Sequence, residues 1–146
     1  MAEQVVRSTF TIFAQTALPL ILAFELFLGG QARLTDRITP GLHKQASRKA
    51  SGYYRWLNFL PVDDAETFQH VIGGLMIFAG ILICVPPMRA MGTLLSMALS
   101  GGGVYSHRKM GVPYWLPAVN TAIAVVILWQ HELLAPENVQ YHGDEL

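Results

Sequence analysis

The chain has 146 residues, of which 52% are hydrophobic and only 14% are charged. Soluble domains average about 25% charged residues, so this composition argues against a water-exposed surface over most of the chain. The ten Lys and Arg residues balance the ten Asp and Glu residues, and a protein without a basic excess is a poor partner for nucleic acid. The length fits a single domain, and one cysteine, Cys84, excludes an intramolecular disulfide.

Four apolar segments are long enough to cross a membrane, where about 20 apolar residues span the hydrocarbon layer. They comprise approximately residues 10–29, 67–85, 88–105 and 112–129. Core helices of a soluble protein would carry a polar stripe, whereas the fourth segment contains no charged residue. The first segment is longer than the apolar part of a signal peptide and no A-x-A site follows it, so we expect it to be retained. We therefore predict an all-α integral membrane four-helix bundle that forms one domain.

The cations of the chain lie mainly in two loops. The loop between the first two segments and the loop before the fourth hold eight Lys and Arg residues, and the opposite side holds only Arg7 and Arg89. By the positive-inside rule the two basic loops face the cytosol and both termini face the lumen or the exterior. The chain ends in Gly-Asp-Glu-Leu, which is similar to the retention signals of the endoplasmic reticulum. We therefore expect the protein to lie in the membrane of the endoplasmic reticulum. The alternative is that these four residues belong to an ordinary polar tail.

The long loop over residues 30–66 is predicted to lie in the membrane interface. Its basic residues precede an aromatic and aliphatic cluster made of Tyr53, Tyr54, Trp56, Leu57, Phe59 and Leu60. Cations at the headgroups with rings beneath them are typical of an interfacial element. Such a segment could be an anchor alone or a lid over a site, and the sequence leaves both open.

Glu25 is the most informative polar residue of the first segment, because ionisable side chains at membrane depth are costly and are functional candidates by default. It lies about four residues before the predicted end of that helix. By helical spacing it shares a face with Gln15, Leu18, Leu22 and Gly29. We expect it to line the bundle interior, although an interfacial, solvated carboxylate is the alternative.

Acidic residues precede the second apolar segment. Asp63 and Glu66 have the spacing of a capping box, so we expect Asp63 to cap the helix and Asp64 to be free to turn toward a cavity. Glu66 and His70 stand four residues apart and can meet on one helix face. His70 could serve in chemistry or simply pack against a neighbouring helix.

Small residues recur at intervals of three and four in the third segment, at Gly92, Ser96, Ser100 and Gly103. This pattern lets helices approach closely in lipid. The run of three glycines, 101–103, predicts a loosened helix, and irregular backbone at membrane depth lies against protein or a water-filled cavity. We therefore expect a cavity near Tyr105 and His107. In the fourth segment Asn120 lies about two turns inside.

The strongest polar candidates share the cytosolic half of the predicted bundle, because successive helices alternate in direction. They are one carboxylate, two imidazoles, a phenol and an amide: Glu25, His70, His107, Tyr105 and Asn120. In an apolar cavity these groups could position water and transfer protons, and a buried carboxyl could act as an acid.

The stretch over residues 70–92, HVIGGLMIFAGILICVPPMRAMG, and the later GGGVYSHRKMG resemble the DoxX-like membrane proteins. Those are four-helix bundles with a glycine-rich second helix, a proline and arginine turn, and a third helix that ends in tyrosine and histidine. The resemblance covers about residues 10–130. It departs at Met76, where such sequences commonly carry an acidic residue.

Within that group the chain looks like small fungal membrane proteins of polyketide and terpenoid biosynthesis, a secondary-metabolite class that includes epoxide hydrolases and cyclases. The resemblance implies that an epoxide on a hydrophobic substrate is opened by carboxylate general acid/base catalysis. It makes Glu25 and Asp64 the acid and base pair. The groups that orient or relay would be His70, Tyr105, His107 and Asn120.

Two other functions remain alternatives. DoxX-like proteins related to quinol oxidase subunits imply a non-catalytic accessory or quinone-associated subunit, and a transporter is the third possibility. The chain has no P-loop or dinucleotide fingerprint and offers histidine as its only soft ligand type, so we predict neither a cofactor nor a metal. The expected partners are a hydrophobic small molecule and membrane lipid, with no nucleic acid; a homo-oligomer stays open.

Overall fold

A computed structural model describes residues 2–57 and 61–134, and their side chains from residue 15 to 130 within those ranges. These residues form five α-helices: α1 (Ala2–Leu34), α2 (Pro40–Trp56), α3 (Ala65–Cys84), α4 (Arg89–Met110) and α5 (Trp115–Leu134). A 3-10 turn over Pro86–Met88 joins α3 to α4. The predicted all-α fold is confirmed, since no strand occurs in the described part of the chain. The retention-like tail, Phe59 and Leu60 lie outside the described residues.

The helices run past several of the predicted boundaries. α1 continues through Gly29 and Gly30 to Leu34, five residues beyond its expected end, and α4 ends at Met110 rather than near residue 105. The predicted loosening at the three glycines is wrong, because α4 is continuous through residues 101–103. The reason is packing: a Cβ on Gly103 would lie 3.2 Å from Pro117 Cβ of α5, so small residues here admit a neighbouring helix.

Within the described part of the chain, two helices are long and apolar enough to cross a membrane, over Gln15–Leu34 and Ala65–Cys84, and Trp115–Gln130 is a shorter apolar helix. Only 33% and 39% of the two candidate spans is buried within the protein. Large apolar side chains face outward on several helices, including Phe24, Met91, Trp115 and Trp129, each more than 60% exposed. Spanning by all four predicted segments stays a prediction.

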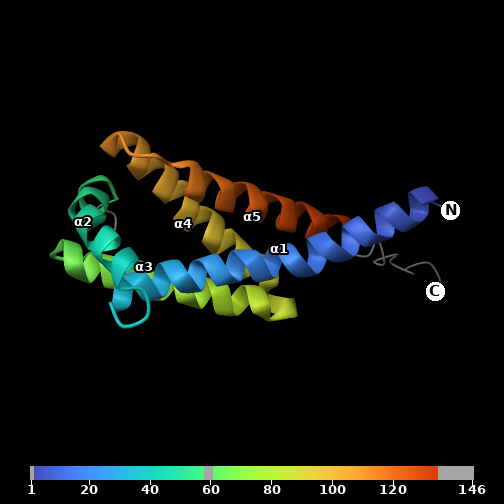
Figure 1. Cartoon of the computed structure of the whole chain (residues 1–146), viewed down its shortest axis with the longest axis horizontal. Helices are drawn as coiled ribbons and strands as arrows, with labels where there is room; N and C mark the ends of the chain where they lie inside the picture. Colours follow the sequence, from blue (N-terminus) through green and yellow to red (C-terminus); the bar gives the residue numbers. More distant parts are fainter. Residues whose placement is uncertain (1, 58–60, 135–146) are drawn as a thin grey trace, which may run out of the picture.

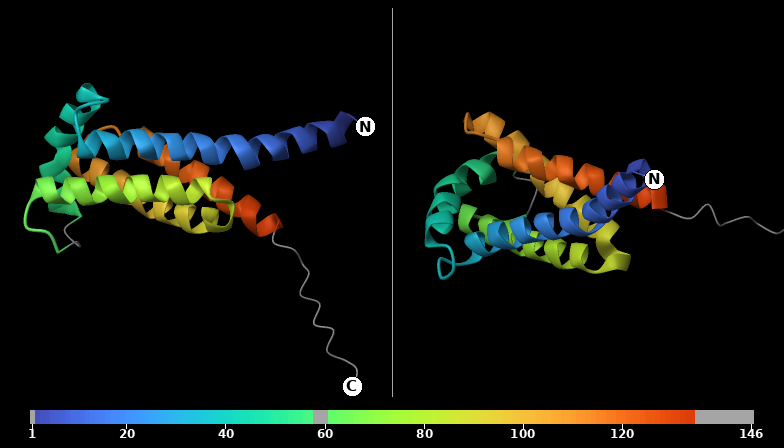
Figure 2. Two further views of the ribbon diagram at one scale, coloured as in Figure 1. Left: turned by 90° about the horizontal axis from the view of Figure 1, so that it is seen from below. Right: turned by 45° about the vertical axis from the view of Figure 1, so that its right-hand side comes forward.

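α1 and α3 lie antiparallel and very close together (Figures 1 and 2). A Cβ added to Gly30 would lie only 2.7 Å from the carbonyl oxygen of Gly73, and one on Gly80 would lie 3.3 Å from that of Ala23. Glycine is therefore required where the two backbones meet. The core beside this contact comprises Leu22, Ala23 and Leu26 of α1, Ala79 and Ile83 of α3, and Ala124 and Ile127 of α5.

The predicted interfacial loop contains helix α2, which crosses the end of the bundle (Figures 1 and 2). Pro40 occupies its first turn, where a missing amide hydrogen costs little. The helix contacts α1, α3 and α4. Tyr54 packs edge-on against Phe68 of α3, with ring centroids 5.9 Å apart, and His43 Nδ1 lies 2.9 Å from the carbonyl oxygen of Ala32. α2 is thus part of the tertiary structure.

Candidate functional site

The last turn of α4 is built to hold His107. Gly111 ends the helix with a left-handed φ of 67°, a conformation that glycine adopts without strain. The turn that follows brings the carbonyl oxygen of Pro113 to 2.6 Å from His107 Nδ1. A carbonyl oxygen can only accept, so Nδ1 carries the hydrogen and donates it. In the neutral ring Nε2 is therefore left as an acceptor.

Tyr53 of α2 meets that acceptor. Its hydroxyl is hydrogen-bonded to His107 Nε2, and because Nε2 of the neutral ring carries no hydrogen, the hydroxyl is the donor. The two ring centroids are 5.5 Å apart. The resulting chain runs from the Tyr53 hydroxyl through the imidazole to the Pro113 carbonyl. The two bonds fix which ring nitrogen of His107 carries the hydrogen.

Arg33 and Gln69 extend this polar cluster to α1 and α3. The guanidinium carbon of Arg33 lies 5.8 Å from the centre of the Tyr53 ring, and Nη1 donates to the carbonyl oxygen of Gly29 at 2.8 Å. Gln69 Nε2 donates to the Arg33 carbonyl oxygen at 3.0 Å and lies 3.4 Å from Ser47 Oγ of α2. Helices α1 and α4 thus contact Tyr53 directly, and α3 contacts α2 through Gln69 and Ser47.

Burial keeps this phenol and imidazole neutral. Desolvation raises the pKa of Tyr53, and the nearby positive charge of Arg33 offsets only part of the shift. Desolvation also lowers the pKa of His107, which lies beyond the predicted span. The hydrogen bond to Pro113 raises that pKa in part, and the positive charges of Lys49 and Arg33 lower it further. Near pH 7 the pair is a phenol donor and an imidazole acceptor.

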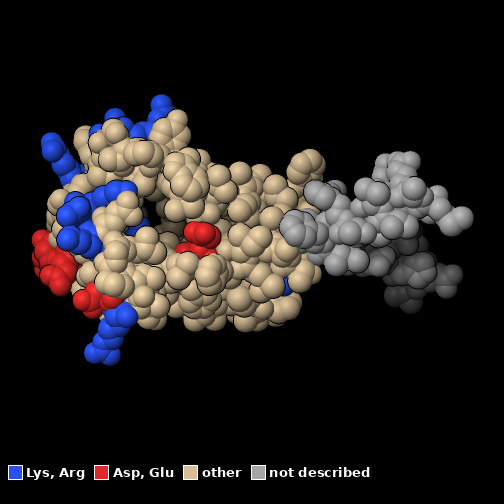
Figure 3. Space-filling view, viewed as in Figure 1, with Lys and Arg blue, Asp and Glu red and all other residues tan. Residues whose placement is uncertain are grey.

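Glu25 lies deeper than its predicted place near the end of α1. The helix extends nine residues past it, which is about 13 Å at 1.5 Å per residue. It is half-buried in the candidate span Gln15–Leu34. None of the hydrogen bonds or ion pairs between described side chains includes it. The space-filling view shows an isolated acidic group on an uncharged flank, beside a hollow that separates it from the basic end at α2 (Figure 3).

Asp64 is the N-cap of α3, not Asp63 as predicted. Its carboxylate accepts the amide hydrogens of Glu66 and Thr67, both at 2.8 Å, and the Thr67 hydroxyl at 2.8 Å. α3 begins at Ala65, so the capping position falls on the residue just before it. These bonds lower the pKa of the exposed Asp64 carboxyl. The expectation that Asp64 is free of the cap is therefore wrong.

Glu25 and Asp64 are not brought together. The contacts of Gly30 with Gly73 and of Gly80 with Ala23 place Glu25 level with about residue 78 of α3. Asp64 lies fourteen residues earlier in the chain, or about 21 Å along the helix axis. The two carboxyls cannot act on one reacting bond.

The other predicted site residues divide between the interior and the surface. Asn120 is only 9% exposed and its Oδ1 has no hydrogen-bond partner among the described residues. His70 is exposed, and Tyr105 is 48% exposed, with Lys109 Nζ 5.7 Å from its ring centre. Tyr105 and His107 stand two apart on a continuous helix, and such residues face opposite sides. The two residues therefore do not face the one common cavity that was expected from a loosened α4.

Tyr53 and Arg33 were missed as site residues, because sequence alone placed them in a loop. The only available signal was a tyrosine that follows basic residues with helical spacing. No group of three or more His, Cys, Asp or Glu side chains suited to a metal ion occurs among the described residues. Comparison of the chain with protein-family models, curated proteins and solved structures finds no match.

Proposed function

We propose that the chain is a multi-pass membrane protein that binds a hydrophobic small molecule beside Glu25 and opens an epoxide on it by general acid/base catalysis. The observation that carries the proposal is the half-buried carboxyl of Glu25 inside an apolar candidate span. An ionisable group at the centre of a membrane helix costs about 2.5–3.5 kcal/mol on insertion scales, so it marks a functional site by default.

The membrane location is supported by the outward apolar surface. About two thirds of each candidate span is not buried in the protein, and a core helix of a soluble protein would be mostly buried. The exposed side chains include Leu20, Phe24, Phe78 and Ile81. Exposed apolar side chains on both candidate spans favour a covering medium, and lipid provides one.

Glu25 can supply both proton transfers of the ring opening. In its neutral form the carboxyl gives its proton to the epoxide oxygen as the carbon–oxygen bond breaks. Water, or a hydroxyl of the substrate itself, forms the new bond to that carbon, and its proton goes to the carboxylate, which restores the acid. The product is a diol or a cyclic ether, and no other reactant is needed.

Two polar groups, on Asn120 and Tyr53, would orient the substrate. The buried Oδ1 of Asn120 lacks a partner and could accept a hydrogen bond from a substrate hydroxyl. The oxygen of Tyr53 has lone pairs left after it donates to His107, so it can receive a second polar group of the substrate. Helix α2 then acts as the lid over this end. The epoxide as reacting group rests on the DoxX-like resemblance.

The test is the conversion of a terpenoid epoxide, squalene 2,3-epoxide, by the purified protein in detergent, followed by mass spectrometry of the products. Glu25→Gln should lower turnover at least 100-fold while the protein still elutes as a folded species. Glu66→Gln is the matched control, since it makes the same change in an exposed carboxyl and should keep full turnover. Unchanged turnover in Glu25→Gln would exclude the catalytic role. Stable co-purification with a larger oxidoreductase would favour the accessory subunit instead.

A further inference from the structure

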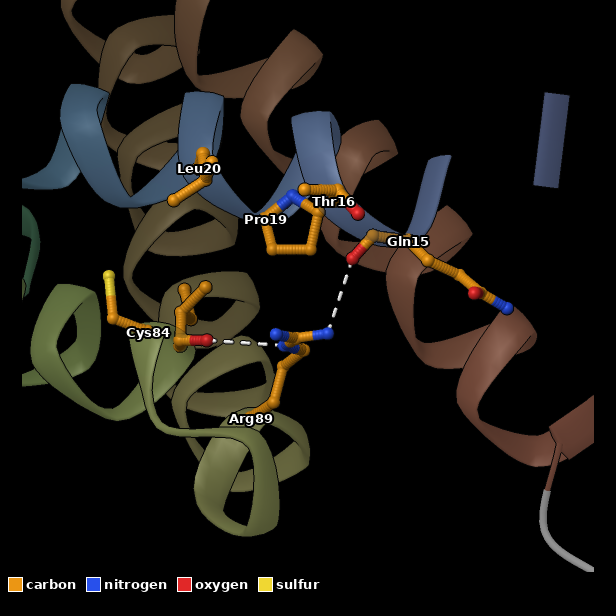
Figure 4. A pocket seen from close by; sticks show the side chains of 7 residues that line it. Gln15, Thr16, Pro19, Leu20, Cys84 and Arg89 are labelled. Carbon is orange, nitrogen blue, oxygen red and sulfur yellow. Dashed lines mark hydrogen bonds between the residues drawn. The ribbon is translucent and has the colours of Figure 1, made fainter. Parts of the chain in front are cut away.

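A proline inside α1 leaves a backbone group without its usual partner. Pro19 has no amide hydrogen, so the carbonyl oxygen of Gln15, four residues earlier, lacks its intrahelical donor. Arg89 at the start of α4 replaces that donor: its Nη1 lies 3.2 Å from the Gln15 oxygen. Its Nε donates to the carbonyl oxygen of Ile83 at 3.2 Å. The guanidinium lies between the two carbonyls (Figure 4).

The same guanidinium lines a cavity of about 280 Å³ at the end of the bundle away from α2. The cavity walls are formed by Gln15, Thr16, Pro19, Leu20, Ile83, Cys84 and Arg89. Arginine has five N–H donors, and the two hydrogen bonds use two of them. No carboxylate lines the cavity, and no described carboxylate forms an ion pair with Arg89. Among the described side chains, the cavity therefore combines a positive charge without a carboxylate partner, further N–H donors and apolar walls.

The depth of the cavity matches the boundary between lipid headgroups and acyl chains. Cys84 is the last residue of the candidate span in α3, and Gln15 of α1 lines the same cavity. Leu20, one turn farther into the first span, is 56% exposed. A ligand with an anionic head at Arg89 could therefore lay a hydrocarbon chain along Leu20 toward the apolar exterior.

We propose that this cavity binds the phosphodiester of an anionic phospholipid, with Arg89 as the residue that holds the phosphate. Guanidinium groups match phosphate oxygens with paired donors. A zwitterionic lipid fits less well, because its ammonium finds no carboxylate on the cavity walls. The site is separate from Glu25 and from the Tyr53–His107 pair, so it holds or fails independently of the epoxide chemistry.

The test is lipid binding by the purified full chain in neutral detergent, measured by native mass spectrometry. Phosphatidylglycerol should bind with one tight site per chain, at least tenfold tighter than phosphatidylcholine or inorganic phosphate. Arg89→Gln should weaken phosphatidylglycerol binding at least tenfold. Arg55→Gln, an exposed charge removal in α2, should leave the tight site unchanged. Tight binding that survives Arg89→Gln, or that is lost in Arg55→Gln, overturns the proposal.

A second variant separates binding from the structural role of Arg89. Pro19→Ala returns an amide hydrogen to position 19, so the Gln15 carbonyl regains its helical donor without Arg89. The double variant Pro19→Ala/Arg89→Gln should recover thermal stability lost in Arg89→Gln but not the lipid affinity. Recovery of the affinity in the double variant would mean that Arg89 only holds the fold together, and would overturn the proposal.

Discussion

At Gly92 α4 lies close against α3, and adding one methyl group there tests the packing directly. A Cβ at Gly92 would lie 2.7 Å from the backbone nitrogen of Ile83, 2.8 Å from the carbonyl oxygen of Ala79 and 2.8 Å from Leu82 Cβ. Ordinary contact begins at 3.4 Å, so α4 must move outward by about 0.7 Å. Two of the three atoms belong to the backbone and cannot rotate away.

The expected magnitude follows from two opposing effects. Overpacking a close contact costs about 1–3 kcal/mol, whereas replacing a helical glycine by alanine gains about 0.5–1 kcal/mol from the smaller loss of backbone entropy. Gly92→Ala should therefore lower the free energy of unfolding by about 1–2 kcal/mol. For a chain of this size that corresponds to a Tm roughly 2–8 °C lower.

Gly101 of the same helix is the matched control, because a Cβ there meets nothing within 4 Å. Gly101→Ala should gain only the entropy effect and raise stability by about 0.5–1 kcal/mol. The pair Gly73 and Gly74 repeats the comparison in α3: a Cβ on Gly73 would lie 2.9 Å from Arg33 Cβ, and one on Gly74 meets open space. Thermal unfolding in detergent measures all four variants. If Gly92→Ala proved as stable as Gly101→Ala, the close packing of α3 and α4 would be refuted.

Two further predictions concern individual hydrogen bonds. Tyr53→Phe removes the donor to His107 Nε2 and leaves a buried acceptor unpaired, so the free energy of unfolding should fall by about 1–2 kcal/mol. Chemical denaturation measures this fall in Tyr53→Phe and in the exposed control Tyr114→Phe. Equal effects in the two variants would contradict the assigned bond. Because the pKa of Asp64 is lower in the folded protein than its ordinary value of 3.8, the ionised carboxylate stabilises the fold at pH values above 3.8. This contribution disappears as the pH falls through the pKa of the folded protein. Asp64→Asn should keep the cap at pH 7 and show a smaller loss of Tm between pH 5 and pH 3 than the parent, whereas Asp64→Ala should be less stable already at pH 7.

Local pattern was enough to predict the apolar helices, because these segments are long and their periodicity depends on neighbours within a few residues. The polar helix α2 was predicted as a loop. The ends were less accurate. Gly29 and Gly30 look like a helix end in the sequence, but they lie inside α1 because α3 packs against them. The cap was misplaced by one residue, from Asp64 to Asp63, since either acidic residue satisfies the sequence pattern.

Composition and helical periodicity by themselves determined that this protein is all-α, strongly apolar and basic at one end. The tertiary structure alone decided which side chains meet. Tyr53 and His107 are 54 residues apart, and Arg89 and Gln15 are 74 apart. Such contacts depend on how each helix is rotated about its axis and on α2 crossing the bundle end. A single sequence does not encode that rotation in any local pattern, because it results from the packing of all the helices together.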